Sequence, residues 1–224
     1  MRRDDYFPTL VYSTKLQDTD AMNRDILAAI QDERDRDNQG IERSNFRSLG
    51  GWHSHNNLHK DPKFQRLTRR AEQMCAGISS DLGYDRNRFL EVTTMWSIAN
   101  PPGSSNRAHI HPGALWSGVF YVQAPEGAGQ IEFIDPRTVH LMNSATFIPK
   151  QRRKMECWTK VKPVAGKMLF FPSWLYHSVE PNLPPGTGNV VPVRASRAII
   201  RYSKSACVAS CPGPKIRTGP RRGR

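Results

Sequence analysis

Apolar residues recur at the spacing of an α-helix in two stretches of the first 88 residues. The first stripe consists of Met22, Ile26, Leu27 and Ile30, and Asp18 or Asp20 is a suitable cap before it. The second stripe consists of Phe64, Leu67, Ala71, Met74, Cys75 and Ile78. It follows Asp61-Pro62, a favourable helix start, and Gly83 closes it. Each predicted helix has one apolar face, so both helices must pack against another layer of structure.

The pattern changes to that of β-strands near residue 89. Residues 7–12 already form a short apolar run suited to a strand, and residues 89–98 are rich in β-branched and aromatic side chains. Glycine or proline then interrupts short apolar runs at 101–103, 127–129, 136, 149, 163–166 and 181–188. This rhythm predicts a β-sandwich or barrel. We therefore expect one mainly β domain over residues 1–204, with a helical buttress at 1–88 and a β core at 89–204.

Length and apolar content narrow the class of protein further. A chain of 224 residues is long enough for one well-buried domain. Its longest apolar runs are far shorter than the ~20 residues of a membrane span, and its start lacks the apolar core of a signal peptide. The four cysteines are scattered without the spacing of a zinc site. We expect a cytoplasmic protein with reduced thiols and no contact with membranes.

Positive charge is concentrated at the C-terminal end of the chain. The net charge is +13, and the residues from Pro181 onward include nine lysines and arginines but no acid. Residues 205–224 contain too few apolar side chains to offset their ordering entropy, so we expect a flexible basic tail. Such a tail, or the basic cluster at residues 150–154, could contact nucleic acid. Solubility alone is the simpler interpretation of both features.

Two histidines stand one residue apart at the start of an apolar run. Side chains on an extended segment return to the same face every second residue, so His109 and His111 can point to one side. His177 ends a second apolar run, where a strand opens into a loop. Strand ends of β-barrels are places where ligand sites open. These three histidines are the candidate metal ligands.

Other histidines offer a rival metal site. His53 and His55 have the same alternating spacing, and His59 follows them closely. They lie in a polar stretch without a supporting apolar strand, which makes preorganisation of a site harder. His140 stands alone, as a surface residue or a neighbour of the metal ligands.

Arg197 lies in a late strand among apolar residues. A guanidinium inside a barrel must find an anion, because an unpaired buried charge is too costly. Its planar fork suits a carboxylate, which it can bind in a bidentate manner. That carboxylate could belong to a bound ligand or to a protein acid such as Asp135.

Several blocks of this sequence together resemble a known family, the iron(II)/2-oxoglutarate oxygenases. The family pattern combines Phe-Pro-Thr, Gly-Trp-x-Ser, Asn-x-x-His-x-His-Pro with Trp-Ser-Gly-Val-x-Tyr-Val, Phe-x-Asp-Pro-Arg, Phe-Pro-Ser-Trp-Leu-x-His and a late Arg. Here these blocks stand as Phe7-Pro8-Thr9, Gly51-Trp52-His53-Ser54, residues 106–122, residues 133–137, residues 171–182 and Arg197. The resemblance covers nearly the whole chain up to about residue 204 and keeps the order of the blocks.

The resemblance implies a double-stranded β-helix, the jelly-roll barrel of cupin-like oxygenases, which binds Fe(II) and 2-oxoglutarate. It implies His109 and His177 as iron ligands and places His111 where the wider superfamily has Asp or Glu. The usual facial triad contains two histidines and one carboxylate. His111 is therefore a departure, and Asp135 is the fallback acidic ligand.

The resemblance also implies a cosubstrate site and a pocket. Arg197 would hold the distal carboxylate of 2-oxoglutarate, with Arg201 as fallback because the insertion at residues 181–193 leaves the register open. The expected polar partners of 2-oxoglutarate, besides the arginine, are Tyr121, Ser117 and Asn106. The expected enclosure of the substrate consists of Trp116, Trp174 and Phe171, although core packing explains these three equally well.

The expected reaction is hydroxylation of a C–H bond of a small-molecule or peptidyl substrate, with release of succinate and CO2. Two other functions fit the same residues. A cupin-type three-histidine dioxygenase would not use 2-oxoglutarate and would form no succinate. A non-catalytic nucleic-acid-binding module would use the basic segments and bind less tightly as salt rises. A homodimer through the outer sheet is compatible with the barrel.

Overall fold

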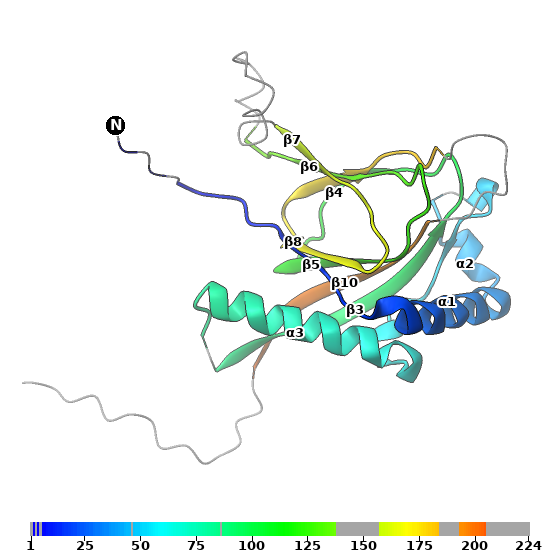
Figure 1. Cartoon of the computed structure of the whole chain (residues 1–224), viewed down its shortest axis with the longest axis horizontal. Helices are drawn as coiled ribbons and strands as arrows, with labels where there is room; N and C mark the ends of the chain where they lie inside the picture. The colour runs from blue at the N-terminus through cyan, green and yellow to red at the C-terminus, as the bar shows by residue number, and fades with distance from the viewer. Residues whose placement is uncertain are drawn as a thin grey trace, which may run out of the picture.

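The computed structural model describes residues 2, 4, 6–45, 47–85, 87–137, 157–183 and 193–204 (Figure 1). The helices are α1 (Thr19–Arg36), α2 (Gln39–Glu42) and α3 (Gln65–Asp81), with 3-10 turns at Arg47–Leu49, Leu58–Lys60 and Pro62–Phe64. The strands are β1 (Tyr12–Lys15), β2 (Trp52–His53), β3 (Arg88–Asn100), β4 (Asn106–His109), β5 (Trp116–Gln123), β6 (Ile131–Ile134), β7 (Trp158–Val161), β8 (Lys167–Pro172), β9 (Tyr176–Val179) and β10 (Val193–Lys204).

Both predicted helices are confirmed, with differences at their starts. Asp18 precedes α1 in a left-handed backbone conformation, and its side chain makes no capping hydrogen bond. Asp61 instead caps the 3-10 turn before α3, where its carboxylate accepts a hydrogen bond from the backbone N–H of Lys63. Helix α3 ends at Asp81, and Gly83 follows with a positive φ of 64°, as expected of a glycine that closes a helix.

The strands form two antiparallel sheets that face each other. One sheet has the order β1-β8-β5-β10-β3-β2, and the other has the order β4-β9-β6-β7. Strands distant in the sequence are neighbours in both, which is the connectivity of a jelly roll. The predicted double-stranded β-helix is therefore confirmed. The predicted strand at residues 7–12 is shifted, because pairing with Phe170 and its neighbours on β8 places β1 at Tyr12–Lys15.

The six-stranded sheet is buried on both faces. Helices α1 and α3 cover its outer face (Figure 1), and its inner face looks toward the four-stranded sheet. On β5, Phe120 and Val122 belong to the core under the helices, whereas Val119 and Tyr121 belong to the core between the sheets. This double burial explains why residues 116–122 are almost continuously apolar and are all buried.

Several predictions from the sequence concern residues that the structure does not describe. His140, the basic cluster at residues 150–154, residues 184–192, Cys207, Cys211 and the tail 205–224 are among them. Cys75 and Cys157 are free thiols. No helix within the described ranges has the length and apolar character needed to cross a membrane. The domain boundaries stay a prediction.

Candidate metal centre

His109 and His177 are direct cross-strand neighbours. His109 is the last residue of β4, and the antiparallel register places it opposite His177 on β9. Side chains that face each other in this way lie on the same side of the sheet. The centroids of the two imidazoles are 4.2 Å apart. The pairing of β4 with β9 thus brings together two histidines separated by most of the β core.

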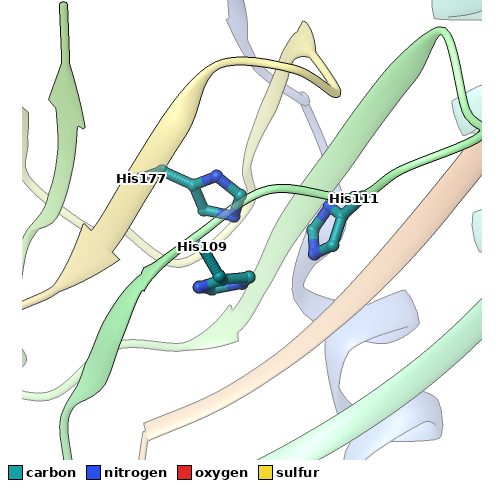
Figure 2. Close-up of side chains that lie close together, drawn as sticks. All are labelled: His109, His111 and His177. Carbon is teal, nitrogen blue, oxygen red and sulfur yellow. The ribbon is translucent and has the colours of Figure 1, made fainter. Parts of the chain in front are cut away.

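His111 completes the group from just beyond β4. Its backbone N–H donates to the carbonyl oxygen of Ser173 (2.9 Å), which ties the segment after β4 to the turn after β8. Its ring centroid lies 5.1 Å from that of His109 and 5.0 Å from that of His177. One nitrogen of each ring lies within 4.8 Å of the others, and the three imidazoles converge (Figure 2). Within the described ranges, no other group of three or more His, Cys, Asp or Glu side chains could hold a metal ion.

Hydrogen bonds orient two of these rings through Nδ1. Nδ1 of His109 donates to the carbonyl oxygen of Arg107 (2.7 Å), and Nδ1 of His177 donates to that of Leu175 (2.9 Å). A carbonyl can only accept, so Nδ1 carries the proton and Nε2 carries the lone pair in the neutral ring. Partners of this kind are typical behind the histidines of metal sites.

Two serines hold the third ring. Nδ1 of His111 shares a hydrogen bond with Oγ of Ser117 (2.7 Å), and that oxygen shares one with Oγ of Ser173 (2.8 Å). Ser117 and Ser173 are buried, at 1% and 0% exposure. Ser117, an expected partner of the cosubstrate, is therefore engaged with His111. Ser173 was not singled out from the sequence, although it lies within the Phe-Pro-Ser-Trp block.

Aromatic side chains close the inner side of the centre. His177 is only 2% exposed, and Phe171 contacts it edge-on with centroids 4.7 Å apart. Phe133 packs in turn against Phe171, at 4.9 Å. These contacts shield the His177 ring from water, whereas His109 and His111 are partly exposed.

The donor set fits a divalent transition metal. Three imidazoles with oriented rings are ligands suited to iron, zinc or copper. The group contains no carboxylate. The fallback acid, Asp135, instead forms a bidentate ion pair with Arg137, at 2.9 Å to Nε and 2.7 Å to Nη2. This contact raises the pKa of the Arg137 guanidinium.

The rival histidines do not form such a group in the described part of the chain. His53 lies on β2 and stacks on Trp96, whereas His55 is exposed and lies 3.7 Å from the carboxylate of Asp37. His59 belongs to a 3-10 turn, and burial lowers the pKa of its imidazole. The polar stretch 53–59 thus spreads its histidines over separate environments.

A cavity of about 660 Å³ adjoins the metal centre. It is bordered by Ser44, Asn45, Trp52, His53, Trp96, Ile98, Asn100, Ser105, Asn106, Arg107, His109 and His111. The volume falls within the ~300–1,000 Å³ typical of small-molecule sites. Of the expected cosubstrate residues whose side chains the structure describes, Asn106 borders the cavity, whereas Ser117, Tyr121 and Arg201 do not. Trp96, Asn100 and His53 were not assigned to a pocket from the sequence.

The three aromatic residues expected around the substrate lie elsewhere than in this lining. Trp116 packs under the helices, where its ring contacts Tyr12 and its indole N–H donates to the hydroxyl of Tyr84 (3.3 Å). Trp174 lies in the turn between β8 and β9 and is 52% exposed. Phe171 is fully buried behind His177. Side chains alternate along β5, so Trp116 points away from the metal centre and its neighbour Ser117 faces it.

The expected cosubstrate arginines both belong to β10. Arg197 pairs through its backbone with Trp96 on β3 and Val119 on β5, and its side chain lies outside the described atoms. Arg201 is exposed, and its guanidinium lies beside Gly113. Tyr121 is 5% exposed within the core between the sheets.

Comparison with protein families supports the resemblance noted in the sequence. Residues 94–186 match the family described as "Putative 2OG-Fe(II) oxygenase". The matched segment runs from within β3 to just beyond β9 and contains all three histidines. No curated protein matches the sequence.

Solved structures share the fold at low sequence identity. A prolyl-4-hydroxylase from Pseudomonas putida is 16% identical, with a TM-score of 0.54 over 86% of this chain and 93% of that one. The carbocyclase SnoK of nogalamycin biosynthesis is 13% identical, with a TM-score of 0.59 over 86% and 80%. HygX from Streptomyces hygroscopicus, solved with nickel and 2-oxoglutarate, is 13% identical, with a TM-score of 0.55 over 88% and 84%.

Proposed function

We propose that the protein hydroxylates a C–H bond of a small-molecule or peptidyl substrate, because residues 94–186 match the 2OG-Fe(II) oxygenase family. In this proposal His109, His111 and His177 hold Fe(II). Bound iron and 2-oxoglutarate supply the oxidising chemistry, in which oxygen is consumed and succinate and CO2 are released. The protein supplies ligands, an anchor for the cosubstrate and an enclosed pocket.

The convergence of three oriented imidazoles is the observation that carries this proposal. Nδ1 of His109 and of His177 is held by a carbonyl, which directs the lone pair of Nε2 to the metal. For His111 to bind through Nε2, its Nδ1–H must donate to Ser117, which can pass the hydrogen bond on to Ser173. All three rings are then neutral ligands.

A site without a carboxylate ligand has an electrostatic consequence. Fe(II) on three neutral imidazoles keeps its full double charge, whereas a carboxylate ligand would cancel part of it. The dianion of 2-oxoglutarate can neutralise this charge in a partly buried site, where an uncompensated charge is costly. We therefore infer that His111 strengthens the binding of the cosubstrate.

We assign the anchor for the distal carboxylate of 2-oxoglutarate to Arg197. Its backbone pairs with Trp96, which lines the cavity, and with Val119 of the core between the sheets. A guanidinium binds a carboxylate through two parallel hydrogen bonds, a geometry that lysine does not provide. Arg201 is the alternative anchor on the same strand.

Anaerobic titration of the purified protein with Fe(II), with and without 2-oxoglutarate, tests this proposal. We expect a visible charge-transfer band only when both are present, and succinate formation after oxygen is admitted. His177→Ala should lose iron binding and the band, whereas His55→Ala, at an exposed histidine, should keep both. Arg197→Gln should keep iron and lose the band, whereas Arg201→Gln should keep both. Loss of the band in Arg201→Gln alone would assign the anchor to Arg201 instead. Iron binding and succinate formation by His177→Ala would refute the metal assignment.

The lack of a carboxylate in the group favours one second candidate, a three-histidine dioxygenase that does not use 2-oxoglutarate. The same titration separates the two functions. The second candidate predicts iron binding by the three histidines, no band with 2-oxoglutarate and no succinate.

A further inference from the structure

The cavity beside His109 and His111 has two chemically different walls. One wall is aromatic: the ring of His53 stacks on Trp96 with centroids 6.0 Å apart and planes 12° apart. Trp96 in turn meets His111 edge to face, also at 6.0 Å. The aromatic wall therefore starts at the metal centre and leads away from it along β3 and β2.

Most of the remaining lining residues carry an amide or a hydroxyl group. Asn100 and Asn106 are joined by a hydrogen bond of 3.4 Å from Nδ2 to Oδ1, and Ser44, Asn45 and Ser105 add further polar groups. Each of these side chains can both donate and accept a hydrogen bond. They are complementary to ligand groups that also do both, as alcohol hydroxyls do.

A hydrogen bond orients His53 within the aromatic wall. Its Nδ1 donates to the carbonyl oxygen of Ser54 (2.7 Å), so the lone pair of the neutral ring lies on Nε2. The hydroxyl of Ser54 bonds to the carbonyl oxygen of His55 and accepts from the backbone N–H of Ser97, which holds this segment against β3. The orientation of His53 is thus built into the fold.

The charge of the lining excludes one class of ligand. Among the described residues that border the cavity none is acidic, and the ionised one is Arg107, which is exposed. A positively charged ligand would lose its hydration without gaining a counterion there. A neutral ligand meets no such penalty.

We propose that the primary substrate is a neutral, polyhydroxylated ring compound, a saccharide or the sugar unit of a glycoside. The C–H face of its ring lies against the His53–Trp96 wall, and its hydroxyls bond to the amides of Asn100 and Asn106. This places ring carbons next to His109 and His111. The inference rests on the proposed function, because it takes the adjoining metal centre as the place of reaction.

Calorimetric titration of the anaerobic protein loaded with Fe(II) and 2-oxoglutarate tests this inference. The probes are methyl α-glucoside, methyl β-galactoside and maltose, compared with an N-acetylated prolyl peptide amide and an N-acetylated lysyl peptide amide. We expect saturable binding of at least one sugar and none of the lysyl peptide. Asn106→Ala and His53→Ala should each weaken sugar binding at least tenfold, whereas Trp158→Ala, at an exposed tryptophan on β7, should not change it. Thermal unfolding of each variant verifies that it is folded.

Every other outcome counts against the inference. Binding of the prolyl peptide in place of the sugars would assign a peptidyl substrate, and failure of all the sugars to bind would overturn the saccharide class. The charge-transfer band recorded on the same samples keeps the two proposals apart. A band without sugar binding refutes only the saccharide, and sugar binding without a band refutes only the use of 2-oxoglutarate.

Discussion

His109 and His177 face each other across the β4–β9 pair, with ring centroids 4.2 Å apart. Each donates its Nδ1–H to the carbonyl oxygen two residues earlier in its own chain segment, Arg107 and Leu175. The two histidines are thus held in the same way on two strands. A shift of the pairing by one residue would turn one of them to the opposite face of the sheet.

The hydrogen bond between His111 and Ser117 predicts a role for a residue outside the group of three histidines. Ser117→Ala removes the partner of Nδ1, so the ring loses its preferred orientation. We expect Fe(II) to bind about 10–100-fold more weakly, as is typical when such a partner is lost. Ser178→Ala is the control, because Ser178 lies beside His177 but donates to Glu132. Unchanged iron affinity in Ser117→Ala, measured by anaerobic titration, would contradict this prediction.

The neutral ligand at position 111 predicts a charge effect on the cosubstrate. His111→Asp supplies a carboxylate and lowers the charge of the metal centre by one unit. Neighbouring charges within ~4–6 Å commonly shift an ionic equilibrium by about 1–3 log units, so we expect binding of 2-oxoglutarate to weaken about tenfold or more. The charge-transfer band measures this affinity, and His111→Ala shows the effect of losing the ligand without adding charge. Equal or tighter binding in His111→Asp would show that the charge argument fails.

Gly40 allows Trp52 to pack against α2. A Cβ at this position would collide with the indole of Trp52, whose Nε1–H donates to the carbonyl oxygen of Asp37 (3.2 Å). We expect Gly40→Ala to lower the free energy of unfolding by about 1–3 kcal/mol, the usual cost of overpacking.

Gly77 provides the matched control for this substitution. It is exposed within α3, and nothing lies within 4 Å of an added Cβ. Gly77→Ala should therefore stabilise the protein by about 0.5–1 kcal/mol. Urea denaturation of both variants measures the two effects, and equal stability of Gly40→Ala and the unmodified protein would be inconsistent with the close packing of Trp52.

Tyr12 predicts a loss of stability at alkaline pH. Burial, together with its hydrogen bond to Asp81 (2.6 Å), raises the pKa of the Tyr12 hydroxyl from 10.0 to about 12. Between these values the unfolded chain releases this proton and the folded chain retains it, so the stability contributed by Tyr12 is present below pH 10 and falls toward pH 12. Tyr12→Phe should lack this part of the decline. The free energy of unfolding of both proteins is measured by denaturation from pH 9 to pH 12.5. An equal decline in the two proteins would contradict this prediction.

Local patterns in the sequence were sufficient to predict the two helices and the β core. The stripe that includes Leu67 and Ala71 is buried against the sheet as expected, because helical periodicity and burial follow from local spacing alone. The alternation of His109 and His111 likewise indicated a metal site, although the strand ends at His109 and a backbone hydrogen bond to Ser173 holds His111.

Which face of each strand looks inward was decided only by the tertiary structure. Periodicity places Trp116 and Ser117 on opposite faces but does not say which face meets the metal. The helices cover Trp116, and the core between the sheets therefore receives Ser117, which bonds to a serine 56 positions away. The cavity wall formed by His53 and Trp96 also depends on the tertiary structure, because the two rings meet only when β2 pairs with β3. Such contacts depend on strand register between distant segments, which no local pattern encodes.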